Sequence, residues 1–507
     1  MLAKVKSFGL SGLTGYEVEV ETDVHKGLPG IEMVGLPDAA IKESKERVRS
    51  AIKNSALQFS PNKITINLAP ADVKKEGPLY DLPIALAILS ATEQVNVRSL
   101  EGTVFFGELS LDGSVRRVRG ILPLLLAAKE AGYTQSVIPW ENRAEAACIE
   151  GITVFACRTL KEAVAHFKGE QLLAPLEYSP FEVHAAIYEE DLKFVKGQYA
   201  ARRALEIAAA GGHNLLMIGP PGGGKTMLAK CLPSIMPDLT ADEALETTKI
   251  HSVAGVLGTD GILTKRPFRS PHHTASKIAL TGGGASAHPG EISLAHNGVL
   301  FLDELPEYPR TALEVLRQPL EDNCITVARV SRSVVYPANF MLIASMNPCP
   351  CGNYGSSRGV CTCSPAAIEK YRGRISGPLL DRIDLQIEVD NVTYDDLTSE
   401  SVAEDSATVK ARVNAARAIQ TARYAGTGVH CNARMTSSML NKYCALDSDA
   451  QVLLKNAFER LDLSARAYTR ILKVARTIAD LAASPQVKAE HVAEAIQYRN
   501  ADRKDLL

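Results

Sequence analysis

A glycine-rich run at residues 219–226 has the composition of a loop that binds phosphate groups. It follows the apolar segment 214–218, which predicts a strand, and precedes residues 227–232, which predict the start of a helix. At a helix N-terminus, backbone N–H groups without side-chain bulk can surround phosphate oxygens. We therefore expect Lys225 to reach the β- and γ-phosphates of ATP, and the Thr226 hydroxyl to bind Mg²⁺. The predicted loop consists of Gly219, Pro220, Pro221, Gly222, Gly223, Gly224, Lys225 and Thr226.

Two adjacent carboxylates, Asp303 and Glu304, follow the apolar segment 298–302. Ligands of parallel sheets bind at the carboxyl ends of the strands, where this pair is expected to lie. Asp303 would hold Mg²⁺ through water, and Glu304 would orient or deprotonate the water that attacks the γ-phosphate. The alternative is a solvated acidic turn after a core strand. The phosphate-binding run upstream favours the catalytic interpretation.

Three further polar residues are candidates for the same site. Asn347 follows a third apolar segment, 340–346, and its amide could contact the γ-phosphate or position water. Arg382 lies in the run 379–384, and Arg466 begins a long helical pattern at 464–483. Phosphoryl transfer needs cations that offset the spreading negative charge. From chemistry alone, either arginine could instead be a surface or ion-pair residue.

Four cysteines are grouped as two C-x-C pairs on either side of a short loop rich in glycine and serine. Four thiolates on one tight loop suit a tetrahedral Zn²⁺ ion. The spacing differs from the common C-x-x-C, so four reduced cysteines that bind no metal remain an alternative. A zinc ion here would stiffen the chain directly after Asn347. The candidate ligands are Cys349, Cys351, Cys361 and Cys363.

The bulk composition is that of an ordinary soluble protein. The 507 residues carry a net charge of −2, with 46% hydrophobic and 22% charged residues, and the length favours two to four domains. No apolar stretch long enough for a membrane span is present in the sequence, and the first residues alternate like a strand and not like a signal peptide. We therefore expect a cytoplasmic protein that does not bind membranes.

The pattern of apolar residues divides the chain into four parts. Residues 1–170 predict an α/β unit, with a strand at 64–68, a buried helix at 83–89 and a second helix at 122–131. Residues 171–190 lose periodicity and predict a linker. Residues 191–395 carry the strand–loop–helix pattern of a nucleotide-binding core, and residues 396–507 are helical by pattern without convincing strands.

Several runs resemble those of AAA+ proteins in the branch that includes magnesium chelatase and the MCM helicases. Within that branch the chain is identified as a member of the ComM (YifB) family, and the resemblance covers essentially the whole chain. The runs that carry it are KGLPG at 26–30, VGLP at 34–37, INLAPAD at 66–72, AAAGGHN at 208–214, RSPHH at 269–273 and SGPLLDR at 376–382.

The resemblance implies an α/β fold with three domains. These are an N-terminal Lon-like domain of the ribosomal-S5 type, an AAA+ P-loop core and a C-terminal helical lid of the magnesium-chelatase type. Asn347 becomes the sensor-1 residue, Arg382 the arginine finger offered to a neighbouring subunit, and Arg466 the sensor-2 arginine. A finger acting in trans implies a homo-hexameric ring. Gln198 matches the segment beside the adenine base, although Phe194 departs from the family pattern there.

Two segments of the core match pore elements of the branch. Residues 265–297 would form the helix-2 insert, a pore-facing hairpin, and residues 320–337 the pre-sensor-1 hairpin. Arg329 and Arg332 lie near the tip of the second hairpin. The resemblance makes them contacts to the phosphates of a DNA strand. The alternative is an ordinary exposed turn between strands.

The first domain resembles the proteolytic domain of Lon, whose enzymes use a serine and a lysine. The matching stretches place Leu79 at the position of the nucleophile and Leu124 at that of the lysine. Neither side chain can perform covalent catalysis. The sequence therefore predicts a domain without peptidase activity, used for assembly or for binding a partner.

Three functions compete at this stage. The resemblance favours an ATP-driven hexameric DNA translocase or helicase that moves branched DNA in homologous recombination, including natural transformation. The main alternative is a chelatase-type or protein-remodelling AAA+ motor without a DNA substrate. A protease-associated unfoldase is the third, and it is weakened by Leu79 and Leu124. Stimulation of ATP hydrolysis by DNA would separate the first from the others.

Overall fold

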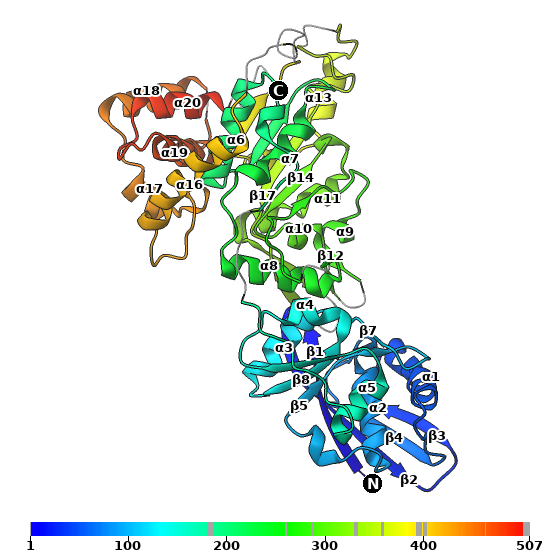
Figure 1. Ribbon diagram of the computed structural model, residues 1–507. Coiled ribbons are helices and arrows are strands. Elements are labelled where there is room, and N and C mark those ends of the chain that lie inside the picture. Colours follow the sequence, from blue (N-terminus) through cyan, green and yellow to red (C-terminus); the bar gives the residue numbers. More distant parts are fainter. Residues whose placement is uncertain are drawn as a thin grey trace.

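The computed structural model of the chain has three spatial parts (Figure 1). A sheet domain formed by the first residues lies at one end, a central sheet with its helices follows, and the C-terminal helices lie beside α6 (Tyr199–Gly211) and α7 (Lys225–Ile235). None of the described helices combines the length and apolar character that a bilayer span requires. The structure describes residues 2–180, 186–258, 261–284, 287–328, 333–355, 359–391, 398, 403–461 and 463–499.

The N-terminal part is built on a seven-stranded sheet in the order β3-β4-β2-β1-β5-β8-β9. The strands β1 and β2 pair antiparallel across a turn at Gly12 and Leu13, whereas β5, β8 and β9 run parallel. The strands are β1 (Leu2–Ser11), β2 (Thr14–His25), β3 (Gly30–Val34), β4 (Lys63–Ala69), β5 (Thr103–Phe105), β8 (Gln135–Pro139) and β9 (Thr153–Cys157), and a separate pair is formed by β6 (Glu108–Leu109) and β7 (Val115–Arg116).

The helices of this part follow the sequence patterns. All residues of α2 are buried, which fits its mostly apolar composition, and α3 ends just before Gly132, which has a left-handed φ of 90°. The predicted strand at 64–68 and the predicted helices at 83–89 and 122–131 are therefore confirmed. The helices are α1 (Ala39–Asn54), α2 (Asp81–Ala91), α3 (Ile121–Glu130), α4 (Arg143–Ala146) and α5 (Leu160–Lys168).

The central part is a five-stranded parallel sheet in the order β11-β14-β17-β10-β18. The inner strands β14 and β17 are fully buried and β10 is buried except for its last residue, as expected for parallel strands covered on both faces. All three apolar segments that flank the candidate site form neighbouring strands of this sheet. The strands are β10 (Leu215–Ile218), β11 (Phe268–Arg269), β14 (Val299–Leu302), β17 (Met341–Met346) and β18 (Leu385–Glu388), and the nearby helices α8 (Ala241–Ala254), α11 (Arg310–Glu314), α12 (Arg317–Asp322), α13 (Pro365–Arg372) and α14 (Gly377–Leu380).

The predicted insert at 265–297 is only partly separate from the sheet. Residues 268–269 form the edge strand β11, which pairs with β14, so the insert begins later than the sequence suggested. The remainder contains α9 (Lys277–Thr281), the short pair β12 (Gly282–Gly283) and β13 (His288–Pro289), and α10 (Glu291–Leu294).

The second predicted hairpin is present, but it begins at residue 324, because residues 320–322 belong to α12. The strand β15 (Cys324–Ala328) pairs antiparallel with β16 (Ser333–Pro337). Arg329 and Arg332 lie outside the described residues.

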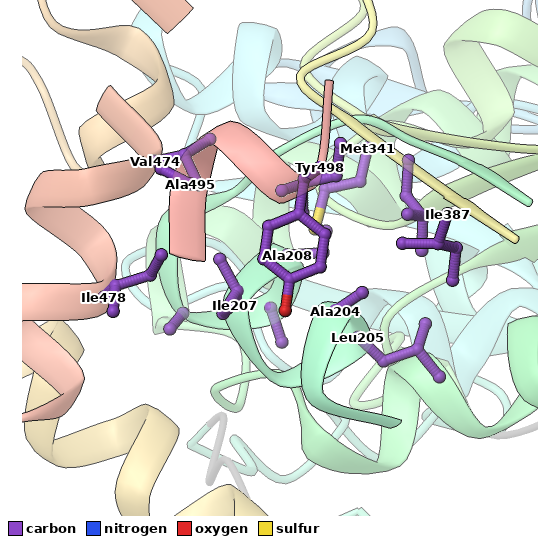
Figure 2. Packing of buried hydrophobic residues seen from close by; sticks show 14 of the residues in the cluster. Ala204, Leu205, Ile207, Ala208, Met341, Ile387, Val474, Ile478, Ala495 and Tyr498 are labelled. Carbon is purple, nitrogen blue, oxygen red and sulfur yellow. The ribbon is translucent and has the colours of Figure 1, made fainter. Parts of the chain in front are cut away.

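The C-terminal helices pack against the core sheet through α6. Figure 2 shows Ala204 and Ile207 of α6 close to Ile478 and to Tyr498, within the largest apolar cluster of the described residues. In the described part of 396–507 the elements are helical, apart from a single β-bridge between Leu446 and Val487. The helices are α16 (Ser406–Arg423), α17 (Ser437–Tyr443), α18 (Ser448–Arg460), α19 (Ala465–Leu481) and α20 (Ala489–Gln497).

A buried polar network joins α19 to the start of β18. The Asp384 carboxylate accepts a hydrogen bond from the Asn214 amide at 3.1 Å, lies 3.3 Å from Nδ1 of His213 and pairs with Arg470 of α19. Burial by itself raises the pKa of Asp384, but the charge of Arg470 and the contact with His213 outweigh it and hold that pKa well below its usual range. This carboxylate is therefore ionised in the folded protein, and it fastens the C-terminal helices to the sheet.

Replacing Asp384 with Asn should lower the free energy of unfolding by about 3 kcal/mol at pH 7, because one member of a buried ion pair is lost. The contribution of a carboxyl with a depressed pKa is complete above its unfolded-state pKa of 3.8 and is lost below it. The difference should therefore be constant above about pH 7, where the His213 imidazole beside Asp384 is neutral in both proteins, and the part contributed by the carboxylate should shrink below about pH 4. Asp381→Asn is the control, because Asp381 pairs with the exposed Arg466 and such a pair contributes about 0–1 kcal/mol. Urea titrations that gave equal losses for both variants would contradict this assignment.

Candidate nucleotide-binding site

A pocket of about 390 Å³ lies where three neighbouring parallel strands end. The phosphate-loop candidate follows β10, the carboxylate pair follows β14, and Asn347 follows β17. Since β17 lies between β10 and β14, the three predicted segments meet at one edge of the sheet. The lining residues are Pro221, Gly222, Gly223, Gly224, Lys225, Thr226, Met227, Asp303, Glu304, Ser345, Met346 and Asn347.

The loop leaves room for phosphate groups. Gly222 and Gly224 have φ angles of 79° and 83°, a left-handed region that favours glycine, and a Cβ on either would meet no heavy atom within 4 Å. Immediately after them α7 begins at Lys225, so backbone N–H groups at a helix N-terminus face the pocket. This geometry fits the phosphates of a nucleotide.

The Lys225 ammonium is held at the base of this loop. It donates hydrogen bonds to the carbonyl oxygens of Gly219 at 2.6 Å and Pro220 at 2.9 Å, and to Oδ1 of Asn347 at 3.2 Å. Burial lowers the pKa of Lys225, and the nearby charges of Asp303 and Glu304 oppose this shift. Lys225 and Asn347 are thus in contact, as their predicted roles at one phosphate group require.

Oxygen donors suitable for Mg²⁺ gather beside the lysine. The Thr226 hydroxyl lies 2.9 Å from Oδ2 of Asp303, and the Ser345 hydroxyl donates to the other oxygen of the same carboxylate. Hydroxyl and carboxylate oxygens are the ligands that this hard cation prefers, so the donor set fits it. Sequence reasoning missed Ser345 because it stands inside an otherwise apolar run, where an isolated serine carries little signal.

Glu304 lies next to a histidine that was not predicted for the site. Its backbone has a φ of 53°, and its carboxylate lies 3.2 Å from Nδ1 of His273. This histidine follows β11, the neighbour of β14, and belongs to the RSPHH run at 269–273. The two consecutive histidines of this run are site candidates by residue type, but the sequence does not show that β11 pairs with β14 and so brings His273 to Glu304.

Gln198 contacts the phosphate-loop candidate, although it does not line the pocket. It precedes α6 with a φ of 53°, and its side-chain amide donates to the carbonyl oxygens of Gly223 at 3.3 Å and Asp390 at 2.5 Å. The neighbouring Phe194 is 57% exposed. The segment 194–198 therefore borders the loop on the side of α6.

The two candidate arginines do not line this pocket, and each lies close to the chain segment that contains the other. The Arg382 guanidinium is buried and donates to the carbonyl oxygen of Pro378 and to the Glu321 carboxylate. Arg466 is exposed and lies 3.2 Å from the Asp381 carboxylate. Neither is among the described residues that line the pocket of its own chain.

The four grouped cysteines form a compact cluster beside the phosphate loop. Their sulfur atoms all lie within 4.8 Å of one another, with Cys349 at 3.3 Å from Cys351 and 3.7 Å from Cys361. Four sulfurs at about 2.3 Å from a tetrahedral Zn²⁺ would be about 3.8 Å apart, which agrees with this arrangement. A Cβ on Gly352 would lie 2.6 Å from Cδ of Pro221, so the loop between these cysteines packs on the phosphate-loop candidate.

Comparisons with known proteins identify the family. Three family models match the chain: subunit ChlI of Mg-chelatase over residues 20–142, magnesium chelatase subunit ChlI over 191–397, and the ChlI C-terminal model over 403–499. The uncharacterized protein YifB of Salmonella typhimurium strain LT2 is 45% identical over 99% of this chain and 98% of its own. The competence protein ComM of Haemophilus influenzae is 42% identical over 98% and 97%. The chain belongs to the ComM (YifB) family of magnesium-chelatase-like proteins.

The ComM (YifB) family is of the AAA+ type related to magnesium chelatase, which suggests ATPase activity with Mg²⁺ as the metal. Its N-terminal part in this chain is also similar to Lon protease 2 of Bacillus subtilis, at 31% identity over 28% of this chain and 25% of that protein. At the positions matched to the Lon dyad, Leu124 is buried and Leu79 packs against the same apolar cluster. The surroundings of both positions are thus apolar.

Removing metal should test the cysteine cluster of this ComM (YifB) protein. We expect about one equivalent of zinc in the purified reduced protein, because Cys₄ sites bind zinc tightly. Cys351→Ser together with Cys361→Ser should abolish this content, whereas the control Cys148→Ser with Cys324→Ser, which changes two cysteines outside the cluster, should retain it. Less than about half an equivalent by elemental analysis would contradict a zinc site.

Proposed function

We propose that this protein hydrolyses ATP at the pocket formed by residues 219–226, Asp303, Glu304 and Asn347. The observation that supports this most strongly is the meeting of the loop, the carboxylate pair and the amide at one sheet edge. Lys225 and the backbone N–H groups of the loop bind the phosphates. Thr226 and Asp303 hold Mg²⁺, which supplies charge neutralisation at the β- and γ-phosphates.

Each remaining polar group of the pocket then has a chemical task. Glu304 accepts a proton from the attacking water or orients that water. Asn347 contacts the γ-phosphate and, through its hydrogen bond with Lys225, aligns the lysine. Ser345 orients the Asp303 carboxylate.

We further propose that the working form is a homo-hexameric ring in which Arg382 acts on the ATP of a neighbouring subunit. Arg382 and Arg466 both lie away from the pocket of their own chain, which supports a role at the pocket of another copy. For Arg382 this requires that its guanidinium exchange the Glu321 carboxylate for a phosphate group. Arg466 serves as the sensor-2 arginine and Gln198 borders the base.

The proposed substrate of the motor is DNA. The Haemophilus relative, of similar length and 42% identical, is named a competence protein, which supports a role in natural transformation. We propose that the ring moves along branched or single-stranded DNA in recombination, as a helicase that promotes branch migration. Arg329 and Arg332, which lie outside the described residues, would contact the strand from the hairpin β15–β16. We place this activity in the cytoplasm.

We assign one proposed role to each of the four parts of the chain. Residues 1–170 form a Lon-like domain without peptidase activity, and residues 171–190 link it to the motor. Residues 191–395 are the AAA+ core, and residues 396–507 are its helical lid. In the described residues of 171–190 the structure has neither helix nor strand apart from a β-bridge between Pro175 and Phe155, and Leu173 and Leu176 pack against the N-terminal domain, so the first half of the proposed linker lies on that domain.

A second candidate is a chelatase-type or protein-remodelling motor without a DNA substrate. The three family models named for the ChlI subunit favour it. The two candidates differ in one measurable property, since DNA should not stimulate ATP hydrolysis by a motor of this second kind.

A branch-migration assay on a synthetic three- or four-strand junction tests the DNA motor. The protein should move the junction only with ATP and Mg²⁺, and forked DNA should raise its rate of ATP hydrolysis. Glu304→Gln should retain nucleotide and DNA binding but lose turnover, because it removes the base alone, whereas Lys225→Ala should lose phosphate contacts and nucleotide binding. ATP hydrolysis that no DNA stimulates, with no junction movement, would favour the second candidate.

Salt dependence tests the hairpin arginines. Replacing Arg329 and Arg332 with Ala should weaken DNA binding and reduce the slope of log K against log salt by about 1.5–2, because two phosphate contacts are lost. The control variant replaces the exposed Arg98 and Arg460 with Ala, which changes the net charge by the same amount at distant sites. An unchanged slope for the first variant, measured by fluorescence anisotropy, would remove these residues from the DNA interface.

A further inference from the structure

The N-terminal domain touches the motor at the hairpin β15–β16. The turn between β1 and β2 consists of Gly12 and Leu13, and Gly12 has a φ of 65°. A Cβ on Gly12 would overlap Cγ1 of Val334 on β16, so the Val334 side chain packs directly against the backbone of Gly12, where a larger residue would not fit. Leu13 packs against the apolar cluster of the central part to which Val334 belongs. A domain with Lon-like sequence is therefore seated on the hairpin proposed to face DNA.

A second set of contacts fixes the same domain to α8. The Gly120 amide, at the start of α3, donates to the carbonyl oxygen of Ser252 at 3.0 Å. The buried Glu145 carboxylate accepts hydrogen bonds from the Leu122 amide at 2.9 Å and from the Ser252 hydroxyl. This one carboxylate therefore connects α3 of the N-terminal domain with α8. Leu245 of α8 packs against the apolar cluster around α3. The domain is therefore held at α8 by polar and apolar contacts, in addition to the contact at Gly12.

The hairpin is in turn connected to the insert, and α8 is connected to the segment that leads into β14. The Tyr336 hydroxyl on β16 donates to the carbonyl oxygen of Ala287, directly before β13. From α8, Nε2 of His251 lies 2.9 Å from the carbonyl oxygen of Leu294, at the end of α10 and shortly before β14. The N-terminal domain contacts both the hairpin and α8. Through them it is linked to the insert and to the segment that leads into the carboxylate pair.

We propose that the turn at Gly12 and Leu13 positions the hairpin β15–β16, so that the N-terminal domain acts as a brace for the DNA-facing element of the motor. The apolar contact limits the fluctuations of the hairpin base, and the α8 contacts keep the brace aligned with the core. This gives a role to a domain in which Leu79 and Leu124 replace the residues of a protease. The link to DNA rests on the proposed function, whereas the positioning of the hairpin does not.

The test uses the full chain with Leu13→Asp, which places a carboxylate in the apolar contact with the hairpin. Amide hydrogen exchange in residues 324–328 and 333–337 should become about tenfold faster, because local opening of the hairpin is easier. Basal ATP hydrolysis and nucleotide affinity should stay within about twofold of wild type, since the pocket is not touched, and stimulation by forked DNA should fall at least about fivefold.

Three further variants make this result specific. Leu13→Met should retain the wild-type values because the apolar contact is conserved, and Leu13→Ala should give a smaller change in the same direction, which serves if the aspartate variant fails to fold. Leu111→Asp places the same charge at a leucine of this domain that is 57% exposed, in the loop between β6 and β7, and should behave as wild type.

The outcomes separate this inference from the proposed function. Unchanged hairpin exchange in Leu13→Asp and Leu13→Ala would overturn the positioning role. Faster exchange with undiminished DNA stimulation would overturn the brace as part of the motor. A wild-type protein that DNA does not stimulate would contradict the proposed function, while the exchange measurement would still decide whether Leu13 positions the hairpin.

Discussion

The position of β17 between β10 and β14 is the constraint on which the candidate site depends. Four consecutive residue pairs join β17 to each neighbour, and all three strands run in the same direction. The phosphate loop, the carboxylate pair and Asn347 therefore leave the sheet at the same edge. A shift of one residue in either pairing would turn every side chain to the opposite face. Ser345 would then point away from Asp303, and Asn347 could not reach Lys225.

The segment 378–385 is a second point of convergence. It contains Arg382 and leads into β18, and the C-terminal helices hold it through several bonds. Arg466 and Arg470 of α19 pair with Asp381 and Asp384, and Arg499 donates to the carbonyl oxygen of Ile383 at 2.6 Å. Any displacement of α19 is consequently transmitted to the backbone on either side of Arg382. The helical part is thus connected to the backbone on both sides of the proposed finger.

The sequence was sufficient for the features that have a strong local signal. Buried parallel strands are continuous apolar runs, and the loop at 219–226 has a glycine pattern whose backbone geometry no other residue type adopts as easily. Edge elements were harder, because β11 has two residues and offers no periodicity, so the insert was drawn too long. His273 reaches Glu304 only because β11 pairs with β14, and such long-range pairing leaves no mark on either segment. The Glu321 partner of Arg382 escaped prediction for the same reason.

Leu79 and Leu124, proposed to stand where Lon proteases carry their serine and lysine, limit which side chains the N-terminal domain can accept at these positions. Leu124 is buried within an apolar cluster, and Leu79 packs against it. A lysine restored at Leu124 would bring an ammonium group into that cluster, at a cost of several kcal/mol unless a partner were buried with it. A serine at Leu79 alone would gain no base and would lose apolar contact. A serine–lysine pair at these positions would thus require two coordinated changes, each unfavourable alone, so the apolar packing of the domain itself opposes the gain of peptidase activity.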